Sequence, residues 1–530
     1  MGWCLDLYVY WLIFKSRHFP IILISIMRKF LFVILCCISL NYSFASVFNV
    51  LDYGACNDGS RLTTQAIQKA INACYKSGGG RVYLPTGIYL VGTLNLFSNV
   101  EFYLETGSVL KATTDLTQYQ RHNTELAGIF YTENANNVSI LGNGCIDGDG
   151  LSFMNVGKEK AVGEYDKMYT RQGLDFRKVE GKQGDGPWEP KDRYHQMIVF
   201  SECSDITLKD FKCIDSPYWC FVIVHCERVK IQGLYIDNDL MIPNSDGIDI
   251  ISSSDVTVSD CHIYAGDDAI VLGGYGWHYG DPGFKNILKP SRNICVSNCI
   301  LQSRSSGIRI GGHDQNPMSN YQFDNIVIFD SNRGINISVS DSCSLENVSF
   351  NNIRIETRLH TGDWWGQGEP IKVSAMMLTP EKPKLGKIRN LFFNNITCIG
   401  ENSVVMVADK QTQLEGIYFS NFEFIVRKSR LENIAGGNYD LRVTSHVKRN
   451  LYKADIPVFY IENAKNVFFS QGRMGWENAD CSYHTYAVDA VDVVGLYLTN
   501  VIANSAPSNP NIGAVRTRNC SLVEKQILGE

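Results

Sequence analysis

The amino-acid sequence predicts an all-β fold in which short strands stack as the rungs of a solenoid. A seven-residue phrase recurs along the chain, and Asn, Asp and Gly mark the turns between its copies. The copies that begin at Asp205 and Arg228 are 23 residues apart, and those that begin at Asn325 and Asn347 are 22 apart. A rung of this length cannot bury its inward face alone, so successive rungs must stack and share one core.

The repeated phrase has the pattern of a short strand that ends in a turn. It begins with Asn, Asp or a similar residue, continues with a β-branched residue and alternating side chains, and closes on a small turn and an apolar residue. Such alternation is typical of a strand with one buried face. The copies are NVSILGN (137–143), DITLKDF (205–211), RVKIQGL (228–234), DVTVSDC (255–261), NICVSNC (293–299), NIVIFDS (325–331), NVSFNNI (347–353), NLFFNNI (390–396), GIYFSNF (416–422), NVFFSQG (466–472) and GLYLTNV (495–501).

Equivalent positions of successive copies are predicted to form ladders along the solenoid. Phe211, Leu234, Cys261 and Cys299 end four successive phrases, so we expect them to stack inside the core. The two cysteines are therefore predicted to be core thiols rather than metal ligands or a disulfide. The Asn residues that begin phrases are predicted to form a ladder at a turn. No C-x-x-C pair is accompanied by a second one, so a structural zinc is not expected.

One helix is predicted over residues 63–74, as the cap of the solenoid. Thr63 or Thr64 is the expected N-cap and the glycines at 78–80 are the expected stop. A solenoid needs its end covered, and this helix comes before all of the repeats. Its apolar side chains recur at helical spacing, at Ala66, Ile67, Ala70, Ile71 and Cys74.

Composition places the chain among globular proteins with a large core. It has 530 residues, of which 45% are hydrophobic and 20% charged, and a formal net charge of -6. A nucleic-acid-binding protein of this size usually carries an excess of basic residues or a basic run. We therefore expect no nucleic-acid partner.

The first 45 residues are predicted to be a leader that contains a signal peptide. From Met27 the chain reads MRKFLFVILCCISLNYSFAS, which is a basic start, an apolar stretch and a small-x-small ending at Ala45. We expect a signal peptide at 27–45, cleavage after Ala45, and a single domain over 46–530. The protein is then secreted or periplasmic and has no membrane partner after cleavage. An N-terminal membrane anchor is the alternative.

Two short acidic segments are the first candidates for a functional site. One carries Asp246, and the other carries Asp267 and Asp268. Asp246 and Asp267 are 21 positions apart, which is about one rung, and stacked strands lie about 4.8 Å apart. We therefore expect three carboxylates to converge. Such a group suits glycosidic hydrolysis, in which one acid protonates the leaving oxygen and another activates water. Acids at solenoid turns and a calcium site are the alternatives.

The acidic segments occur with other motifs that resemble glycoside hydrolase family 28, the polygalacturonase family. The resemblance implies a right-handed parallel β-helix of the pectin-lyase-like type, and inverting hydrolysis of a pectic polysaccharide without a metal or cofactor. It assigns the general acid to Asp267 and the water-activating pair to Asp246 and Asp268. The motifs are FNVLDYGACNDG (48–59), GGGRVYLPTGIYL (78–90), NSDGIDI (244–250), GDDAIVL (266–272) and, resembling plant-like and bacterial exo-type members, DWWGQGEPI (363–371).

The sequence departs from the family pattern at two places. Ser306 stands where the family's G-H-G motif has its histidine, and Asn336 and Ser338 stand where its R-I-K motif has Arg and Lys. The resemblance implies that this Arg and Lys hold the sugar carboxylate. Asn336 and Ser338 can hydrogen-bond a sugar but carry no charge. We therefore expect weaker selection for uronate at the cleavage subsite.

Other residues near the acids are candidates to replace the missing groups. Arg309 lies about one rung from the acids and is predicted to bind a carboxylate or hydroxyl; a salt bridge to a catalytic acid is the alternative. His313 is the candidate for the missing histidine, with a surface or loop histidine as the alternative. Asn244, two positions before Asp246, completes the predicted polar ligands of the substrate.

Loops outside the rungs are predicted to wall a cleft. The polar segments 156–192 and 424–452 are expected to be such excursions, and a third inserts at 273–290. Aromatic side chains in the walls stack on sugar rings, and the alternative for each is packing against the solenoid. The aromatic or histidine candidates for substrate binding are Trp277, His278, Trp364 and Trp365.

Together these features predict an exported glycosidase that acts on pectic polysaccharide or oligosaccharide. Pocket-forming loops favour exo action, and the uncharged cleavage subsite favours a rhamnogalacturonan-type substrate. Two other classes stay open: a β-helix that binds carbohydrate without hydrolysing it, and a polysaccharide lyase, which would need calcium and a basic residue.

Overall fold

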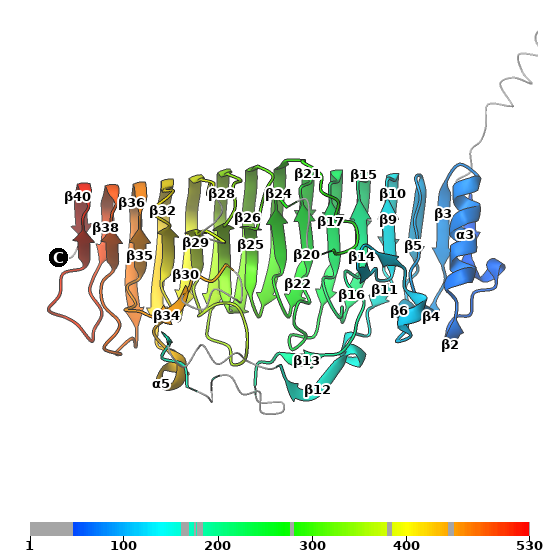
Figure 1. Ribbon diagram of the computed structural model, residues 1–530, viewed down its shortest axis with the longest axis horizontal. Helices are drawn as coiled ribbons and strands as arrows, with labels where there is room; N and C mark the ends of the chain where they lie inside the picture. Colours follow the sequence, from blue (N-terminus) through cyan, green and yellow to red (C-terminus); the bar gives the residue numbers. More distant parts are fainter. Residues whose placement is uncertain are drawn as a thin grey trace, which may run out of the picture. The chain divides into compact units, whose positions relative to one another are not determined.

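The computed structural model describes residues 46–160, 169–173, 176, 184–275, 280–378, 384–443 and 450–528. From Val47 onward these residues form stacked rungs of parallel strands, coloured from blue to red in Figure 1. Two long parallel sheets, of 12 and 22 described strands, run along the stack. The predicted leader and its cleavage site lie outside the described residues. In the described part, no helix has both the length and the apolarity needed to cross a membrane.

The 12-stranded sheet contributes one strand to each rung and carries the side chains discussed below. Its order follows the chain, so every neighbour is the next rung. Its strands are β9 (Phe130–Glu133), β14 (Ile198–Ser201), β17 (Phe221–Val224), β20 (Ile248–Ile251), β23 (Ile270–Gly273), β25 (Ser306–Gly312), β27 (Arg333–Val339), β29 (Ile371–Ala375), β31 (Val404–Ala408), β35 (Phe459–Glu462), β37 (Val488–Val491) and β39 (Val515–Arg518).

The 22-stranded sheet wraps the rest of each rung. Its early strands come in pairs and its later ones are single long strands that pass through the turn. They are β1 (Val47–Asn49), β2 (Asp58–Leu62), β3 (Gly80–Leu84), β4 (Gly87–Val91), β5 (Val100–Leu104), β6 (Ser108–Ala112), β10 (Asn136–Gly142), β11 (Cys145–Asp147), β15 (Ser204–Lys209), β16 (Lys212–Ile214), β18 (Glu227–Gln232), β19 (Tyr235–Asp237), β21 (Ser254–Ser259), β22 (His262–Ala265), β24 (Ser291–Ser303), β26 (Met318–Ser331), β28 (Leu345–Thr357), β30 (Ile388–Gly400), β32 (Leu414–Arg427), β36 (Ala464–Glu477), β38 (Val494–Ala503) and β40 (Ser521–Leu528).

Asn side chains hold the corners of the rungs, as the repeats predict. Asn347 donates its side-chain amide to Asn320 at 3.4 Å, and Asn390 donates to Asn347 at 3.0 Å. A second ladder includes Asn298 and Asn325, at 2.8 Å. All of these residues have φ between 55° and 59°. Asn tolerates this left-handed conformation better than most residues, so the chain turns a corner without a glycine.

One repeat was placed at the wrong corner by the sequence pattern. Ile294 of the phrase at 293–299 pairs with Tyr321, and Asn325 therefore belongs to the second Asn ladder. The copy that stacks there is NYQFDNI (320–326) rather than NIVIFDS (325–331). The 22-residue step measured from Asn325 was thus five residues out of phase, because both corners of this rung carry Asn, at 320 and at 325.

The core inside the stack contains the predicted ladder. Phe211, Leu234, Cys261 and Cys299 are each at most 1% exposed. Cys299 pairs in register with Ile326, which continues the row toward the C-terminus. The prediction that these cysteines are core thiols is confirmed, and every cysteine of the described residues is free. Stacked aromatic rings add a second row, with centroids 4.6–5.2 Å apart, at Phe323, Phe350, Phe393, Phe419 and Phe469.

The predicted capping helix is present as α3 (Thr64–Lys76), at the blue end of the stack in Figure 1. It buries Ile67, Ala70, Ile71 and Cys74. The helix ends two residues later than predicted, and Gly79 follows with φ of 122°. A Cβ there would lie 2.5 Å from the carbonyl oxygen of Asn99, so only glycine fits this close approach.

The remaining described elements are short. The 3-10 helices are η1 (Val50–Tyr53), η2 (Leu116–Gln118) and η3 (Gly150–Phe153), and the second α-helix is α5 (Glu432–Ala435). Three antiparallel hairpins leave the rungs: β7 (Arg121–His122) with β8 (Glu125–Leu126), β12 (Met154–Glu159) with β13 (Trp188–Pro190), and β33 (Asn438–Asp440) with β34 (Leu451–Lys453). The described residues of the predicted excursion 156–192 lie outside the two long sheets, and so do those of 424–452 after β32 ends at Arg427.

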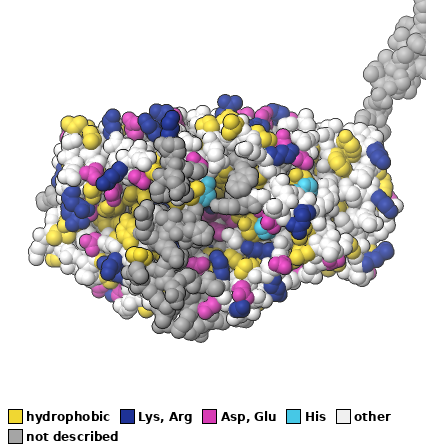
Figure 2. All heavy atoms as spheres, in the orientation of Figure 1, with side chains coloured by type: hydrophobic (Ala, Val, Ile, Leu, Met, Phe, Trp, Pro, Cys, Tyr) yellow, Lys and Arg dark blue, Asp and Glu magenta, His cyan; other side chains and the backbone are white. Residues whose placement is uncertain are grey.

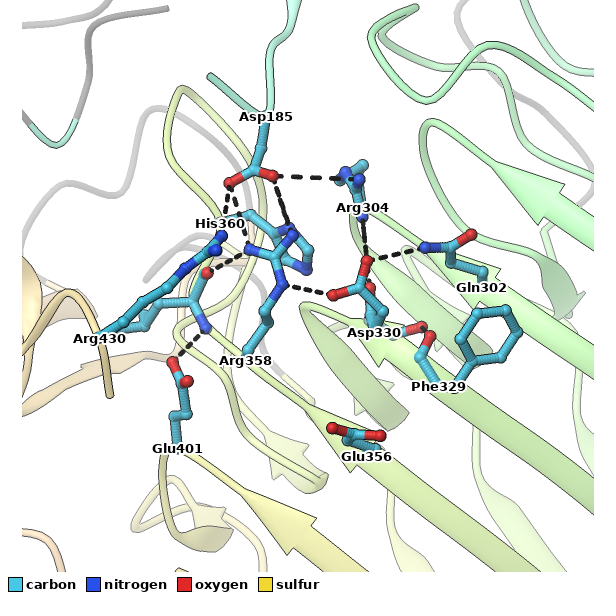
Figure 3. Close-up of polar contacts among 12 residues, drawn as sticks. Asp185, Gln302, Arg304, Phe329, Asp330, Glu356, Arg358, His360, Glu401 and Arg430 are labelled. Atoms are coloured by element: carbon cyan, nitrogen blue, oxygen red, sulfur yellow. Dashed lines mark hydrogen bonds and ion pairs between the residues drawn. The ribbon is translucent and has the colours of Figure 1, made fainter. Parts of the chain in front are cut away.

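A partly buried ion cluster, drawn in Figure 3, ties one excursion to the solenoid. Asp185 accepts hydrogen bonds from both terminal nitrogens of Arg358, at 2.9 and 3.2 Å, and from the amide of Thr361 at 3.0 Å. The indole of Trp364 donates to the Asp185 carbonyl at 3.1 Å. The segment that leads into β13 is therefore fixed against the segment that follows β28. Over the face shown in Figure 2, acidic and basic side chains are intermixed.

Candidate active site

The three acids singled out in the sequence come together where β20 and β23 begin. Asp246 precedes β20, and Asp267 and Asp268 precede β23 on the next rung. One carboxylate oxygen of each lies within 4.8 Å of the other two. Their exposures are only 2%, 8% and 2%. Ile248 pairs with Ile270, so Asp246 and Asp268 occupy equivalent positions on neighbouring rungs.

Asp268 is held by two donors from the following rung. The amide of Ser306 donates to it at 2.9 Å, and a terminal nitrogen of Arg309 at 3.1 Å. Arg309 lies on β25 and is opposite Val271 of β23, so its side chain reaches back toward the acids. The alternative considered for Arg309, an ion pair with one of the acids, is thus what the structure contains.

Asp267 combines burial with a neighbouring like charge. Burial, and then the charge of Asp268, raise its pKa to about 7, although Arg309 acts in the opposite direction. The amide nitrogen of Asn244 lies 3.4 Å from its carboxylate. Arg193 donates to the side-chain oxygen of Asn244 at 3.0 Å, which leaves the amide nitrogen to face Asp267. Asp267 can therefore stay protonated near neutral pH and donate a proton.

Asp246 and a fourth acid, Asp249, are both deeply buried. Burial is the largest cause that raises the pKa of each well above its usual range, followed for Asp246 by the charge of Asp267 and for Asp249 by that of Asp268. Neither oxygen of Asp249 has a hydrogen-bond partner in the described part of the chain. Asp249 was not predicted as a site residue, because its place in NSDGIDI fits a strand position as well as a functional one.

The acids open into a cavity of about 440 Å³. Its walls come from the 12-stranded sheet and from the segments that follow β28 and β33. The described lining residues are Tyr218, Trp219, Asn244, Asp246, Asp267, Asp268, Ser305, Arg309, Gly312, His313, Arg333, Asn336, Ser338, Ser340, Trp365, Lys372, Arg442 and Val443. The size suits one or two sugar units with acids at one side and cations at the other.

The acid group is better suited to proton transfer than to holding a metal. Three oxygens within 4.8 Å can hold a divalent cation. However, the guanidinium of Arg309 already faces Asp268, and the pKa values of Asp246 and Asp267 are raised, so these two groups favour their protonated forms. A cation would have to displace both the guanidinium and the protons.

The sequence matches the description "Glycosyl hydrolases family 28" over residues 74–425. The chain belongs to this family. It is 28% identical over 270 residues to a probable polygalacturonase of Vitis vinifera, a match that covers 47% of this chain and 49% of that protein. It is 26% identical over 285 residues to an exopolygalacturonase of Zea mays, covering 50% of this chain and 62% of that protein. The chain thus spans 49% and 62% of the length of these two relatives.

Solved structures share the fold of this family 28 chain. An exopolygalacturonase from Thermotoga maritima aligns with a TM-score of 0.54 and 22% identity, over 73% of this chain and 88% of that one. A family 28 exopolygalacturonase of Yersinia enterocolitica aligns with a TM-score of 0.58 and 15% identity, over 91% and 79%. The predicted all-β right-handed parallel β-helix and the predicted family are both confirmed.

Two places in this chain depart from the family 28 pattern, and only one of them contributes side chains to the cavity wall. Ser306 is fully buried; it holds Asp268 through its amide, and Ser305 lines the cavity instead. Asn336 and Ser338 do line the cavity, on β27. The hydroxyl of Ser338 lies 3.0 Å from that of Ser374. The family's charged pair is therefore replaced by neutral groups in contact with the cavity.

The other predicted ligands divide into three groups. His313 and Trp365 line the cavity; the ring of His313 lies 3.3 Å from Ser340, and Arg442 stacks 4.9 Å above the ring of Trp365. Trp364 packs in the loop and donates to Asp185 instead, as its alternative predicted. Trp277 and His278 lie outside the described residues.

Sequence analysis missed the cationic wall of the cavity. Arg333, Lys372 and Arg442 come from three segments separated by excursions of unequal length. Only Lys372 had a usable signal. It is opposite Asn336 in register, but the 36 positions between them hide that relation until the insertion is placed.

Proposed function

We propose that this chain hydrolyses glycosidic bonds of pectic polysaccharide or oligosaccharide by acid–base catalysis. The observation that carries the proposal is the convergence of Asp246, Asp267 and Asp268 within 4.8 Å at the edge of a cavity. Family membership and the names of the relatives from Vitis vinifera and Zea mays support pectin as the substrate class.

The roles follow from the electrostatics of each acid. Asp267 has a pKa of about 7 and is proposed to protonate the leaving oxygen. Asp268 is paired with Arg309 and is proposed to take the proton of the attacking water. Asp246, on the neighbouring rung, is proposed to orient that water together with Asp268. The proton is thus given on one side of the scissile bond and taken on the other.

Inversion at the anomeric carbon is the proposed stereochemistry. Acid and base lie about 6.5–9.5 Å apart in most inverting glycosidases and about 5–5.5 Å apart in retaining ones. The closest oxygens here lie within 4.8 Å, which by that rule alone favours retention. We propose inversion because two carboxylates, Asp246 and Asp268, face Asp267. A water held between these two carboxylates does not need the larger acid–base distance that makes room for water in other inverting enzymes. Proton NMR of the first product decides: the opposite anomer supports inversion, and the same anomer contradicts it.

The scissile sugar is proposed to be recognised differently from the family pattern. Asn336 and Ser338 offer hydrogen bonds but no charge beside the acids. This favours cleavage next to a neutral sugar, as in rhamnogalacturonan. A cation elsewhere in the cavity would then bind the carboxylate of a neighbouring uronate. The names of the Zea mays relative and of the two solved structures support an exo mode of action.

Product analysis tests the proposal. The full chain and its D267N variant are incubated with homogalacturonan and with rhamnogalacturonan oligosaccharides, and the products are separated by chromatography. We expect saccharides that are released by the wild type and abolished in D267N. Release only from rhamnogalacturonan would mean that the two neutral positions have changed the specificity.

The same experiment separates the two rival functions. A lyase would give an unsaturated product that absorbs in the ultraviolet and would lose activity in a chelator. A protein that only binds carbohydrate would release nothing from either substrate. Either result would contradict the proposed hydrolysis.

Export is proposed from the N-terminal sequence alone. The basic start at Met27, the apolar stretch and the ending at Ala45 support a signal peptide. N-terminal sequencing of the protein recovered outside the cytoplasm is expected to begin at Ser46.

A further inference from the structure

Lys372 is a buried cation that faces the cavity and has no partner among the residues that the structure describes. It lies on β29, lines the cavity, and is 1% exposed. Among the described residues, no hydrogen bond or ion pair involves its ammonium group. A buried charge without a partner destabilises a fold, so its presence calls for a ligand.

The carboxylates near Lys372 are already used by arginines. Glu369 accepts from Arg333 at 3.2 Å and from the amide of Gln367 at 2.7 Å. Asp440 accepts two bonds from Arg442, both at 2.8 Å. Each carboxylate therefore has its own guanidinium, and Lys372 is the cation left over. The anion that complements it must come from outside the described chain.

The register places Lys372 in line with the acid site. Arg309 of β25 pairs with Asn336 of β27, and Asn336 pairs with Lys372 of β29. Arg309 is occupied by Asp268, and the side-chain oxygen of Asn336 is buried with no donor from the described residues. Beside the acids the cavity thus offers a free hydrogen-bond acceptor for a hydroxyl, and then a free cation.

We propose that Lys372 binds the carboxylate of a uronic acid unit of the substrate, next to the scissile bond. The inference rests on the proposed function for the identity of the sugar, but the unpartnered cation is independent of it. Compared with the family pattern, the positive charge that binds a uronate lies one rung further along, on β29 instead of on β27, the strand of Asn336 and Ser338. Lys372 is then a specificity-determining residue and takes no part in proton transfer.

The lowered pKa of Lys372 is consistent with an anion-binding site that is empty. Burial is the main cause that lowers its pKa to about 7, and the neighbouring Arg333 adds to it, while Asp440 and Glu369 act in the opposite direction. An incoming carboxylate raises that pKa and stabilises the ammonium form. Uronate binding is therefore expected to weaken as pH rises above about 7, because the empty site then loses its proton.

Binding in an inactive background tests the proposal. The full chain carrying D267N, with and without Lys372→Met, is titrated calorimetrically with oligogalacturonate and with the same oligosaccharide after its carboxyls are reduced to alcohols. We expect K372M to weaken binding of the acidic ligand about tenfold to hundredfold, the loss of one charge-assisted hydrogen bond. Binding of the reduced ligand should change less than about threefold. An equal loss for both ligands would overturn the proposal.

Controls separate this subsite from the proposed hydrolysis. K465M removes the same charge from an exposed lysine on the other sheet and should leave both affinities unchanged. K372Q is a second neutral variant in case K372M does not fold. Lys372-dependent binding without any hydrolysis by the wild type would uphold the subsite and contradict the function. If the wild type hydrolyses the substrate, and K372M still prefers the acidic oligosaccharide over the carboxyl-reduced one, the proposed function is upheld and the Lys372 subsite is contradicted.

Discussion

Asp267 shows how one residue becomes an acid near neutral pH. Its carboxyl is buried, lies beside Asp268 and has one weak amide donor, Asn244, at 3.4 Å. Burial and the like charge both disfavour ionisation, and Arg309 limits the effect by stabilising the negative charge. The residue therefore holds its proton under conditions in which an exposed Asp has lost it.

We predict that kcat/KM falls as pH rises above about 7, the pKa of Asp267. The proton donor is present below that pH and is lost above it. In R309Q the cation that lowers this pKa is gone, so the alkaline limb should move upward by about one pH unit or more. Activity at the optimum should also fall, because Asp268 loses its partner. The pH–rate profiles of wild type and R309Q check this; a limb that moves downward or stays in place would contradict it.

The acids could be predicted from the sequence because their spacing is about one rung. Asp246 and Asp268 occupy equivalent positions, so counting along the repeat was enough. Lys372 could not be placed by counting, because an insertion of unknown path separates it from Asn336. Trp364 and Trp365 are adjacent in sequence, yet only Trp365 lines the cavity, and no sequence pattern distinguishes them.

Strand β20 contains an acid at an apolar position. Asp249 pairs with Val222 on one side and Val271 on the other, and all three are at most 1% exposed. Both carboxyl oxygens lack a partner in the described part of the chain. The strand thus carries a buried group that valine would replace without loss of a hydrogen bond.

We predict that D249V raises the free energy of unfolding at pH 7 by about 1–3 kcal/mol, the usual effect of removing an unsatisfied buried polar group. The pKa of Asp249 is raised in the folded state, so the unfolded chain releases its proton first and wild-type stability falls as pH rises above about 4. The gain from D249V should therefore be larger at pH 8 than at pH 5 in urea unfolding. D249N keeps a polar group and should gain less; a destabilised D249V would contradict the argument.

Asp185 joins the segment before β13 to the segment after β28, as Figure 3 shows. We predict that D185N lowers the free energy of unfolding by about 1–3 kcal/mol, because the partly buried Arg358 then keeps only Asp330, among the described residues, as an ion-pair partner. The cations and hydrogen bonds around Asp185 hold its pKa well below its usual range, so this difference should shrink as pH falls below about 4.

A matched variant tests whether burial is the cause. Arg228 makes the same two-pronged contact with Asp205, at 2.7 and 2.8 Å, but both side chains are exposed. D205N should cost less than about 1 kcal/mol. Equal losses in D185N and D205N, measured by thermal unfolding, would show that the cluster contributes no more than a surface ion pair.

At the scale of the whole molecule, the solenoid was predictable and its walls were not. The rungs repeat, so Asn ladders and core positions could be read from the phrases, apart from the five-residue phase error at Asn325. The excursions occur once each and have no repeat to guide them. Their positions depend on single contacts, such as that of Arg333 with the Asp440 carbonyl at 2.7 Å.

These walls determine how a polymer can enter. Trp365, Arg442 and Val443 line the cavity, and they come from the excursions after β28 and β33. On the other side Arg193 contacts Asn244 and also lines a second cavity of about 620 Å³ toward earlier rungs. The polymer is therefore expected to lie over the earlier rungs, with its terminal unit against Trp365. We therefore propose that this site removes units from a chain end.

We predict that the full chain releases only short saccharides from homogalacturonan or rhamnogalacturonan in the first minutes, because internal sugars cannot pass the wall at Trp365. Oligosaccharides labelled at one end make the test direct. End-wise attack leaves the label either on a chain shortened by one product length or on that first product. Internal cleavage would instead give labelled fragments of many lengths at once, together with a rapid fall in viscosity. The D267N variant measures how much product forms without catalysis. Labelled fragments of many lengths at early times would show that the polymer extends past Trp365, and would contradict the prediction.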